Sequence, residues 1–428
     1  MAKYWLWLTT RRFIGSQAVR KLLRHFGTPE AIYAADPDTL RCLNLLSSRE
    51  LEALSDHSMD LPEKILADCY EQNISILTLQ DAQYPERLRN IYDPPAVLYY
   101  RGRLPNFDTE PAVAVVGTRN CTPYGILMAR QLGYQMANDG ALVVSGLAAG
   151  IDRYAMEGAL SAERPVTGVL GGGVDVVYPS GNRLLYEDVA VRGCLLSEYP
   201  PGTQPLSAHF PVRNRIIAGL TLGCLVVEAP EDSGALITAR LALEQGRDVF
   251  AVPGNVGSVK SRGCNRLLKE GAILVENGWD VMQEYEAAFP GVVRNRSGGE
   301  RLTLSRKEYK TASQNAVQQA EAGTAPEEKT EAAPSAEAPA ETADPPVQDS
   351  QVYLDLQAMQ STRSRDQLRI LQALADGPVH ADDIVERTQL RTATVNAALS
   401  LLEVDGLVEK LPGRHYKLTI PVRPDQPD

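Results

Sequence analysis

The run at 210–220, FPVRNRIIAGL, carries the most distinctive chemistry in the chain. Apolar residues after Pro211 recur at helical spacing, which predicts a short helix beginning just after this proline. Arg213 and Arg215 would then lie in its first turn, where unpaired N–H groups already carry partial positive charge and disfavour cations. Two arginines in such a place indicate that an anion binds there. Pairing of each arginine with an acidic neighbour is the alternative.

The two arginines cannot both face one ligand. Residues two positions apart on a regular helix diverge by about 200°. We therefore expect one of Arg213 and Arg215 to face the anion, while the other braces Glu198, Glu228 or a loop.

Residues 110–285 supply the elements that would position this helix. Short apolar segments alternate with helical ones such as 124–138 and 236–245, which is typical of a parallel sheet with helices on both faces. The predicted strands are 112–116, 142–145, 166–170, 194–197, 224–227, 249–252 and 273–275.

Small residues follow almost every predicted strand. In an open α/β sheet, ligands bind beyond the carboxyl ends of the strands. The loops in question are 117–125, 145–152, 171–175, 233–238, 253–255 and 263–265. Each alone is typical of a tight strand-to-helix turn. Together on one rim, with Arg119, Arg213, Arg215, Lys260 and Arg262 nearby, they indicate a site for a nucleotide or an extended polyanion.

Composition divides the chain further. Residues 1–65 are predicted to form a small helical domain of SAM or helix-hairpin-helix type, either a DNA contact or a structural cap. Residues 66–288 are predicted to form a Rossmann-like domain. The Ala/Glu/Pro-rich stretch 289–362 is predicted to be a disordered acidic linker. Residues 363–421 have the three-helices-then-hairpin order of a winged helix.

The formal charge of −11 does not exclude a nucleic-acid partner. Residues 321–350 hold eight acidic residues and one base, so this segment alone contributes −7. The six cysteines are widely spaced, which disfavours a zinc site. We see no signal peptide and no apolar run long enough to span a membrane, so we expect a cytoplasmic protein.

Several catalytic patterns are missing from the sequence. It has no Gly-Lys dipeptide for a Walker A loop and no G-x-S-x-G elbow, and its first glycine loop is not GxGxxG. His209 lacks a metal partner or nucleophile in the sequence. Glu228, Glu231 and Asp232 could position an arginine or act as acid/base groups. We expect no catalytic residue, metal or cofactor.

These features together resemble the DNA-processing protein A (DprA/Smf) family, from about residue 76 to residue 281. The resemblance rests on Gly117-Thr118-Arg119 with Tyr124-Gly125, Ser145-Gly146-Leu147-Ala148 with Gly150-Ile151-Asp152, Tyr178-Pro179, Ser197-Glu198, Phe210-Pro211-x-Arg213-Asn214-Arg215-Ile216-Ile217, Ser233-Gly234, Pro253-Gly254 and Gly263-Cys264-Asn265. It implies an extended Rossmann-like domain that binds single-stranded DNA, a homodimer, and delivery of incoming DNA to RecA recombinase in natural transformation.

This sequence departs from the family pattern at three positions. Ala149 stands where the family usually has Arg, Met156 where it usually has His, and Ser180 where Lys or Pro is frequent. The loss of two potential cations predicts weaker phosphate contacts than is typical of the family.

The predicted DNA-binding residues combine the arginines with the small-residue loops. Arg119, Arg213 and Arg215 would neutralise phosphates. Asn214 would contact a base edge or fix the loop, and Phe210 would stack on a base or pack in the core. The full set is Gly117, Thr118, Arg119, Ser145, Gly146, Phe210, Arg213, Asn214, Arg215, Ser233, Gly234, Lys260, Arg262 and Asn265.

Two alternatives remain open. The first is a Rossmann-like nucleotide N-glycosidase, although residues 228–234 lack the Pro-Gly-Gly…Gly-Thr…Glu pattern of such enzymes. The second concerns the winged helix, which is nearly neutral and offers Arg391, Lys410, Arg414 and Lys417 to a DNA backbone. We expect it to bind a partner protein, or duplex DNA weakly.

Overall fold

The computed structural model describes residues 2–298 and, with gaps, residues 365–418. The chain divides into two compact units, 1–328 and 329–428. The predicted linker lies outside the described residues from 299 onward. No helix in the described part of the chain has the length and apolar character needed to cross a membrane.

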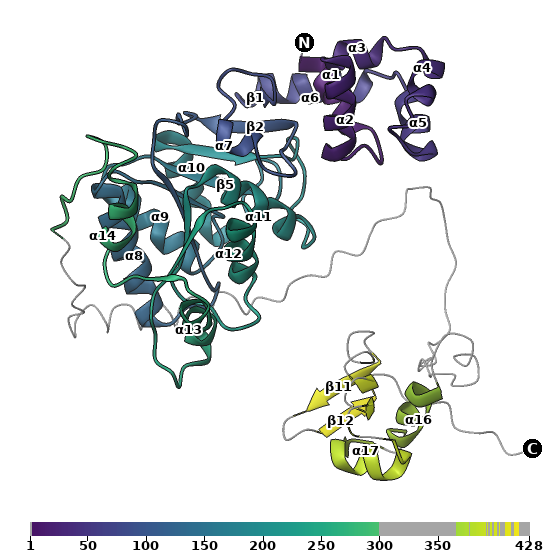
Figure 1. Ribbon diagram of the computed structural model, residues 1–428, viewed down its shortest axis with the longest axis vertical. Coiled ribbons are helices and arrows are strands. Elements are labelled where there is room, and N and C mark those ends of the chain that lie inside the picture. The colour runs from purple at the N-terminus through teal and green to yellow at the C-terminus, as the bar shows by residue number, and fades with distance from the viewer. Residues whose placement is uncertain are drawn as a thin grey trace, which may run out of the picture. The chain divides into compact units, whose positions relative to one another are not determined.

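A nine-stranded sheet forms the centre of the first unit (Figure 1), with strand order β1-β2-β6-β5-β4-β3-β7-β8-β9. The strands are β1 Ser75–Thr78, β2 Val97–Gly102, β3 Ala112–Val116, β4 Leu142–Ser145, β5 Val166–Leu170, β6 Cys194–Ser197, β7 Gly223–Val226, β8 Asp248–Ala251 and β9 Ile273–Leu274. All seven predicted strands are present and pair in parallel. The antiparallel pair β1 and β2 was not predicted.

The order of the strands creates a switch point between β3 and β7. From β3 the chain adds β4, β5 and β6 on one side, then crosses to β7 on the other side. Loops that leave adjacent strands at such a point lead to helices on opposite faces and leave a crevice at the carboxyl edge. The predicted binding loops all lie along this edge.

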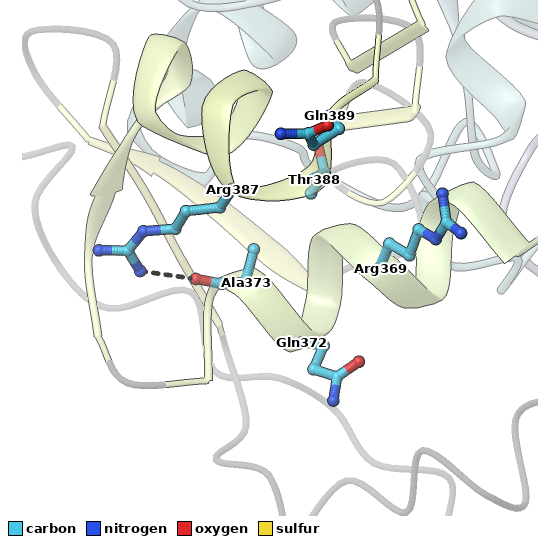
Figure 2. Close-up of a pocket in the computed structure, with 6 residues that line it drawn as sticks. All are labelled: Arg369, Gln372, Ala373, Arg387, Thr388 and Gln389. Carbon is cyan, nitrogen blue, oxygen red and sulfur yellow. Dashed lines mark hydrogen bonds between the residues drawn. The ribbon is translucent and has the colours of Figure 1, made fainter.

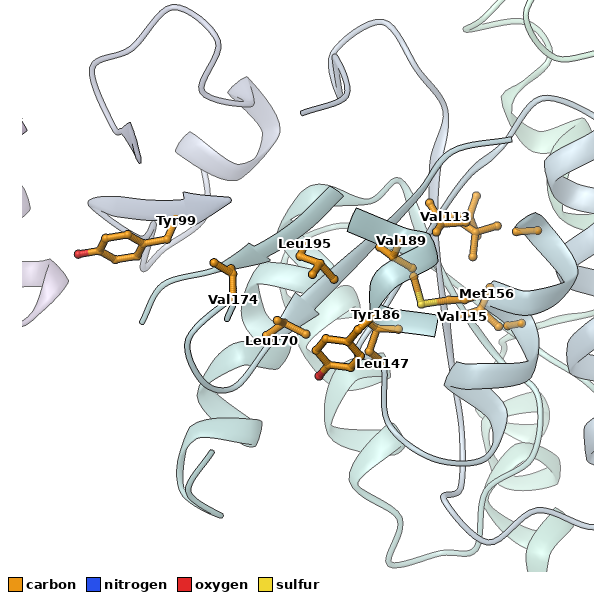
Figure 3. Packing of buried hydrophobic residues seen from close by; sticks show 14 of the residues in the cluster. Tyr99, Val113, Val115, Leu147, Met156, Leu170, Val174, Tyr186, Val189 and Leu195 are labelled. Carbon is orange, nitrogen blue, oxygen red and sulfur yellow. The ribbon is translucent and has the colours of Figure 1, made fainter. Parts of the chain in front are cut away.

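Helices cover both faces of the sheet. They are α7 Glu86–Arg89, α8 Pro123–Asn138, α9 Ile151–Ser161, α10 Arg183–Arg192, α11 His209–Leu220, α12 Gly234–Glu244, α13 Arg262–Lys269 and α14 Trp279–Met282. Alternate residues of β3 enter different cores: Val113 and Val115 pack with α8, α9 and α10, whereas Ala114 and Val116 pack with α11 and α12. Figure 3 shows the first core around Val113 and Val115. Side chains that alternate along a strand face opposite sides of a sheet, so both cores depend on each central strand.

Six helices precede the sheet: α1 Ala2–Thr10, α2 Ser16–Phe26, α3 Pro29–Tyr33, α4 Pro37–Cys42, α5 Ser48–Ser55 and α6 Asp60–Glu71. Gly27 ends α2 with φ +79°, and Thr28 caps α3 by accepting from the Ala31 N–H. The predicted domain boundary at residue 65 falls inside α6. Trp5 and Trp7 of α1 belong to the same apolar cluster as Tyr99 of β2, so these helices pack on the edge of the sheet.

The second unit contains α16 Arg365–Ala373, β10 Val379–His380, α17 Ala381–Thr388, β11 Val408–Leu411 and β12 His415–Leu418. The strands form a three-stranded sheet in the order β10-β12-β11, over a core that includes Ile370, Ile384 and Leu399. Most of the predicted third helix, and the turn at 412–413, lie outside the described residues.

Candidate nucleic-acid interface

The loops after β3, β4 and β7 are tied together by backbone hydrogen bonds. The Thr118 N–H donates to the Glu228 carbonyl at 2.7 Å, and the Thr118 carbonyl accepts from the Ile151 N–H at 3.2 Å. Gly150 packs against the β3–α8 loop and has φ +79°. A Cβ atom added to Gly150 would come within 2.4 Å of the Arg119 carbonyl oxygen. A glycine is therefore required for the two loops to meet.

The loops after β7 and β8 meet in the same way. The Gly263 N–H donates to the Ala229 carbonyl at 2.8 Å. The Asn265 side chain both accepts from the Gly254 N–H at 3.2 Å and donates to the Gly254 carbonyl at 3.0 Å. Lys260 donates through Nζ to the carbonyl of Asn120 in the β3 loop. The carboxyl edge is thus one connected surface, which we call the rim.

Arg119 and two aromatic rings, those of Phe210 and Tyr178, form a cluster on the rim, and the guanidinium carbon of the buried Arg213 lies 5.8 Å from the Phe210 ring centre. The guanidinium carbon of Arg119, in the β3–α8 loop, lies 5.2 Å from the ring centre of Phe210. The Tyr178 ring lies 5.5 Å from the same ring, tilted by 34°. Arg119 is exposed, Tyr178 is 37% exposed and Phe210 is half-buried against Gly171. The cluster combines an accessible charge with accessible ring surface.

Phe210 and its neighbours begin α11, which starts earlier than predicted. The helix begins at His209, so Pro211 is its third residue. Proline is tolerated there because the first four N–H groups of a helix have no partner within it. Arg213 and Arg215 are therefore the fifth and seventh residues, and the prediction that they lie in the first turn was wrong.

Arg213 points into the protein. The residue is 5% exposed, and its side chain donates through one terminal nitrogen to the carbonyls of Gly146, at 2.9 Å, and Val169. Its Nε donates to the side-chain oxygen of Asn214 at 3.2 Å. Burial lowers the pKa of Arg213, and the nearby carboxylate of Asp152 opposes that effect. Arg213 thus holds the ends of β4 and β5 together from behind the rim.

Asp152 is the counter-charge of this arginine. It lies in the first turn of α9, is buried, and accepts from the Gly146 N–H at 3.1 Å. Burial raises its pKa, and Arg213 limits the rise. Asp152 binds the N–H of Gly146 and Arg213 binds its carbonyl, so the two side chains hold the loop after β4 at this residue, where an added Cβ would lie 2.6 Å from the Arg213 guanidinium.

Arg215 is also buried and forms two ion pairs inside the protein. Its Nε lies 3.0 Å from the carboxylate of Asp93, in the α7–β2 loop, and a terminal nitrogen lies 2.7 Å from that of Glu198, after β6. Burial lowers the pKa of Arg215, but these two carboxylates outweigh it and the net shift is upward. The expectation that one arginine braces Glu198, Glu228 or a loop is confirmed for Arg215 and Glu198, but both arginines are buried, so neither is the exposed partner that was expected to face the anion. Arg213 braces a loop as well.

The remaining predicted residues differ in accessibility. Ser145 is fully buried, and its hydroxyl donates to the Val115 carbonyl at 2.6 Å. Gly146 is buried beneath the loop. Gly234 and Arg262 are exposed, and the others are partly exposed: Gly117, Thr118, Asn214, Ser233, Lys260 and Asn265.

Glu228 occupies the crevice at the switch point. Its carboxylate accepts from the Thr122 N–H at 2.7 Å and from the Thr122 hydroxyl at 2.6 Å. Burial raises its pKa, whereas these bonds and Lys260 lower it. Among the described residues, no cluster of three or more His, Cys, Asp or Glu side chains could hold a metal ion. Because Thr122 is the N-cap residue of α8, these contacts indicate that Glu228 positions the start of that helix.

Sequence reasoning missed three residues that build the rim: Tyr178, Asp93 and Asp152. Tyr178 and Asp152 are visible in the family motifs, but their roles depend on contacts with α11. Asp93 follows an unremarkable turn more than a hundred residues before its partner Arg215. No local pattern marks it.

The departures from the family pattern fall in different environments. Met156 is fully buried in the core on the α8–α9 side (Figure 3), so position 156 does not present a side chain to the rim. The prediction that its replacement removes a phosphate contact is therefore wrong. Ala149 is partly exposed in the β4–α9 loop and Ser180 is exposed, so these two substitutions do alter the surface.

The winged-helix unit has a polar hollow of its own, of about 560 Å³. Arg369 and Gln372 of α16 and Arg387 of α17 line it, with Gln389 just beyond the end of α17 (Figure 2). Arg387 donates to the Ala373 carbonyl at 3.2 Å. Of the residues predicted to touch DNA, Lys417 pairs with Glu409 at 2.9 Å. Arg391, Arg414 and the Lys410 side chain lie outside the described residues.

Comparisons with known proteins agree with this architecture. The family model for DNA recombination-mediator protein A matches residues 75–286, and that for the DprA winged helix domain matches residues 354–414. Protein Smf of Synechocystis is 34% identical over 421 residues, covering 97% of this chain and 98% of the relative. DNA processing protein DprA of Streptococcus pneumoniae is 45% identical over 215 residues, covering 50% of this chain and 76% of the relative.

A solved structure shares the fold as well. The X-ray structure of DprA from Streptococcus pneumoniae aligns with a TM-score of 0.59 and 36% identity, covering 66% of this chain and 98% of the other. The Rossmann-like sheet and the winged helix are therefore both established. The chain belongs to the DNA processing protein A (DprA/Smf) family.

Proposed function

We propose that this protein binds single-stranded DNA along the rim. Arg119 would pair with backbone phosphates, assisted by N–H groups of the glycine loops, while bases stack on Phe210 and Tyr178. The proposal is supported by the exposed cluster on the rim and by relatives whose names describe DNA processing.

The observation that carries the proposal is the contact between Arg119 and Phe210. A base can stack on an aromatic side chain only when it is free of its own duplex stack, so accessible rings beside a cation favour single strands. Stacking tolerates every base, so we expect little sequence preference. Because counterions are released from the phosphates, binding should weaken steeply with salt.

Arg213 and Arg215 have a different role in this proposal from the one inferred from sequence. Their buried hydrogen bonds and ion pairs favour a positioning role, in which they fix α11 and the β4 loop beneath the DNA. The phosphate contacts then fall to Arg119, Lys260 and Arg262.

The wider role rests on the family. We propose a cytoplasmic, non-catalytic homodimer that protects incoming DNA and loads RecA recombinase on it during natural transformation. Loading is tested by RecA ATPase activity on single strands coated with a single-strand-binding protein. Addition of this protein should shorten the lag, and an unchanged lag would refute loading without bearing on DNA binding.

The binding proposal itself is tested by titration of labelled oligo-dT and a duplex of equal length over a salt series. Single strands should bind at least tenfold more tightly, with a linear fall of log affinity against log salt. Equal affinity for the two forms, or binding independent of salt, would overturn the proposal.

A further inference from the structure

Helix α2 presents one strongly cationic face. Its sequence, SQAVRKLLRHF, contains three Lys or Arg residues and no acidic residue. Gln17, Arg20, Lys21 and Arg24 share one side by helical spacing, opposite the buried side chains of α2. Lys21 and Arg24 are exposed and Arg20 is partly exposed, so the face is accessible to an external anion.

An aromatic ring stands beside these cations. Tyr92, between α7 and β2, is 80% exposed. Its carbonyl accepts from Gln17 Nε2 at 2.7 Å and from an Arg20 terminal nitrogen at 3.2 Å. The ring is thus held next to the cationic face by its own backbone. An accessible ring among cations is the arrangement that binds single-stranded nucleic acid.

The same loop connects this face to the rim. Asp93 accepts from the Ser16 hydroxyl at the start of α2, and on its other side it pairs with Arg215 at 3.0 Å. Arg215 lies five residues after Phe210 on α11, a rise of about 7.5 Å. A strand leaving Phe210 would therefore need only a few nucleotides to reach Tyr92.

The acidic neighbours leave the charge of the face in place. Asp93 is paired with Arg215. Glu50 lies near Lys21, which contributes to the lowered pKa of that carboxyl after the larger effect of Ser47. Arg24 is exposed, and the exposed Arg12 stacks 5.0 Å from the Phe13 ring, itself 56% exposed, just before α2. Arg12, Arg20 and Arg24 keep the surface cationic.

We propose that Arg20 and Arg24 of α2, together with Tyr92, form a second contact surface for single-stranded DNA. It takes the nucleotides that extend past the rim, with the arginines on phosphates and the Tyr92 ring on a base. This surface rests on the proposed function, because it lengthens the DNA path that begins at Arg119 and Phe210.

The test compares oligo-dT lengths in the full-length protein. An oligonucleotide of about six residues fills the rim alone, whereas one of about twenty covers both surfaces. The double variant Arg20→Ala/Arg24→Ala should bind the short oligonucleotide like wild type and the long one about tenfold more weakly. Its salt slope on the long one should be smaller by about 1.4, since about 0.7 is lost per phosphate contact.

Tyr92→Ala provides an independent readout. It should weaken binding of the long oligonucleotide about fivefold or more without changing the salt slope, and Tyr92→Phe should restore the affinity. Lys64→Ala removes an exposed cation from α6 and serves as the matched control, with wild-type affinity at both lengths.

The outcomes separate the two proposals. If the arginine variant and the tyrosine variant both bind the long oligonucleotide with wild-type affinity, the proposal of an α2 surface is refuted, whereas the proposal of DNA binding at the rim is unaffected. Absence of single-strand binding by the wild-type protein at either length would instead refute the proposed function. An equal loss at both lengths would show that α2 acts through the rim, which also contradicts a separate surface.

Discussion

The guanidinium carbon of Arg119 lies 5.2 Å from the ring centre of Phe210, although 90 residues of chain separate them. Arg119 follows β3 and Phe210 lies in the first turn of α11. In the proposed complex, Arg119 would act on DNA through charge and Phe210 through stacking, so their contributions should differ in salt dependence. The following predictions use that difference.

Arg119→Ala should weaken single-stranded DNA binding by about 5- to 30-fold, because it removes a charge-assisted phosphate contact of about 1–2 kcal/mol. The salt slope should fall by about 0.7. The exposed side chain is not part of the core, so the melting temperature should stay unchanged. Fluorescence anisotropy over a salt series measures both effects, and an unchanged affinity and slope would place the DNA elsewhere.

Phe210→Ala should cost about 1–3 kcal/mol of DNA-binding free energy through lost stacking. The salt slope should remain that of the wild type, because no charge is removed. Phe210→Tyr keeps the ring and serves as the control. A reduced slope in Phe210→Ala would mean that the ring acts by positioning Arg119.

Arg213→Met should destabilise the protein by about 3–5 kcal/mol, because it leaves the Asp152 carboxylate and two strand-end carbonyls without their buried partner. Chemical denaturation measures this loss. Asp152→Asn in the same background removes the uncompensated charge and should recover part of it. If Arg213→Met reduces DNA affinity but leaves stability unchanged, Arg213 is a direct DNA contact.

The pH dependence of Arg213→Met follows from Asp152. Burial raises the pKa of this carboxyl in the folded protein, and removal of Arg213 would raise it further. The folded state then binds more protons than the unfolded state. Unfolding free energy should therefore fall as pH rises through the raised pKa and recover on acidification. Asp152→Asn should abolish this dependence, as followed by denaturation between about pH 4 and pH 8.

Arg215→Met should cost about 2–4 kcal/mol in unfolding free energy, since it breaks two ion pairs around an arginine side chain only 11% exposed. Arg240→Met is the matched control, because its pair with Glu244 is exposed and 3.9 Å long. The control should change stability by less than about 0.5 kcal/mol. Similar melting curves for the two variants would show that the Arg215 pairs do not stabilise the fold.

The glycosidase alternative predicts a product that can be looked for directly. Both oxygens of Glu228 accept from Thr122, which leaves this carboxylate as a brace rather than an accessible acid or nucleophile. We expect no free base after incubation with nucleoside monophosphates, as followed by chromatography. Base release that disappears in Glu228→Gln would establish the enzyme instead.

Much of the central fold could be predicted because its strands are buried on both faces. Continuous apolar runs such as 112–116 and 224–227 mark such strands directly, and the small residues after many of the strands mark the carboxyl edge. Strand β1 was missed because its apolar run is only two residues long. Strand β2 has a longer apolar run, but it is partly exposed and precedes the region in which strands alternate with helices. The winged-helix fold could also be predicted, because its helices and its hairpin follow one another along the chain.

The sequence by itself therefore determined the sheet, the rim and the set of residue types available there. The tertiary structure decided which of them reach solvent. The sequence does not distinguish Arg119 from Arg213 and Arg215. In the structure Arg119 is exposed, whereas Arg213 binds backbone carbonyls and Arg215 binds carboxylates inside the protein. Of their partners, Asp152 lies in the first turn of α9, whereas Glu198 and Asp93 come from two separate loops. Burial and pairing depend on contacts between distant segments, and no local spacing records them.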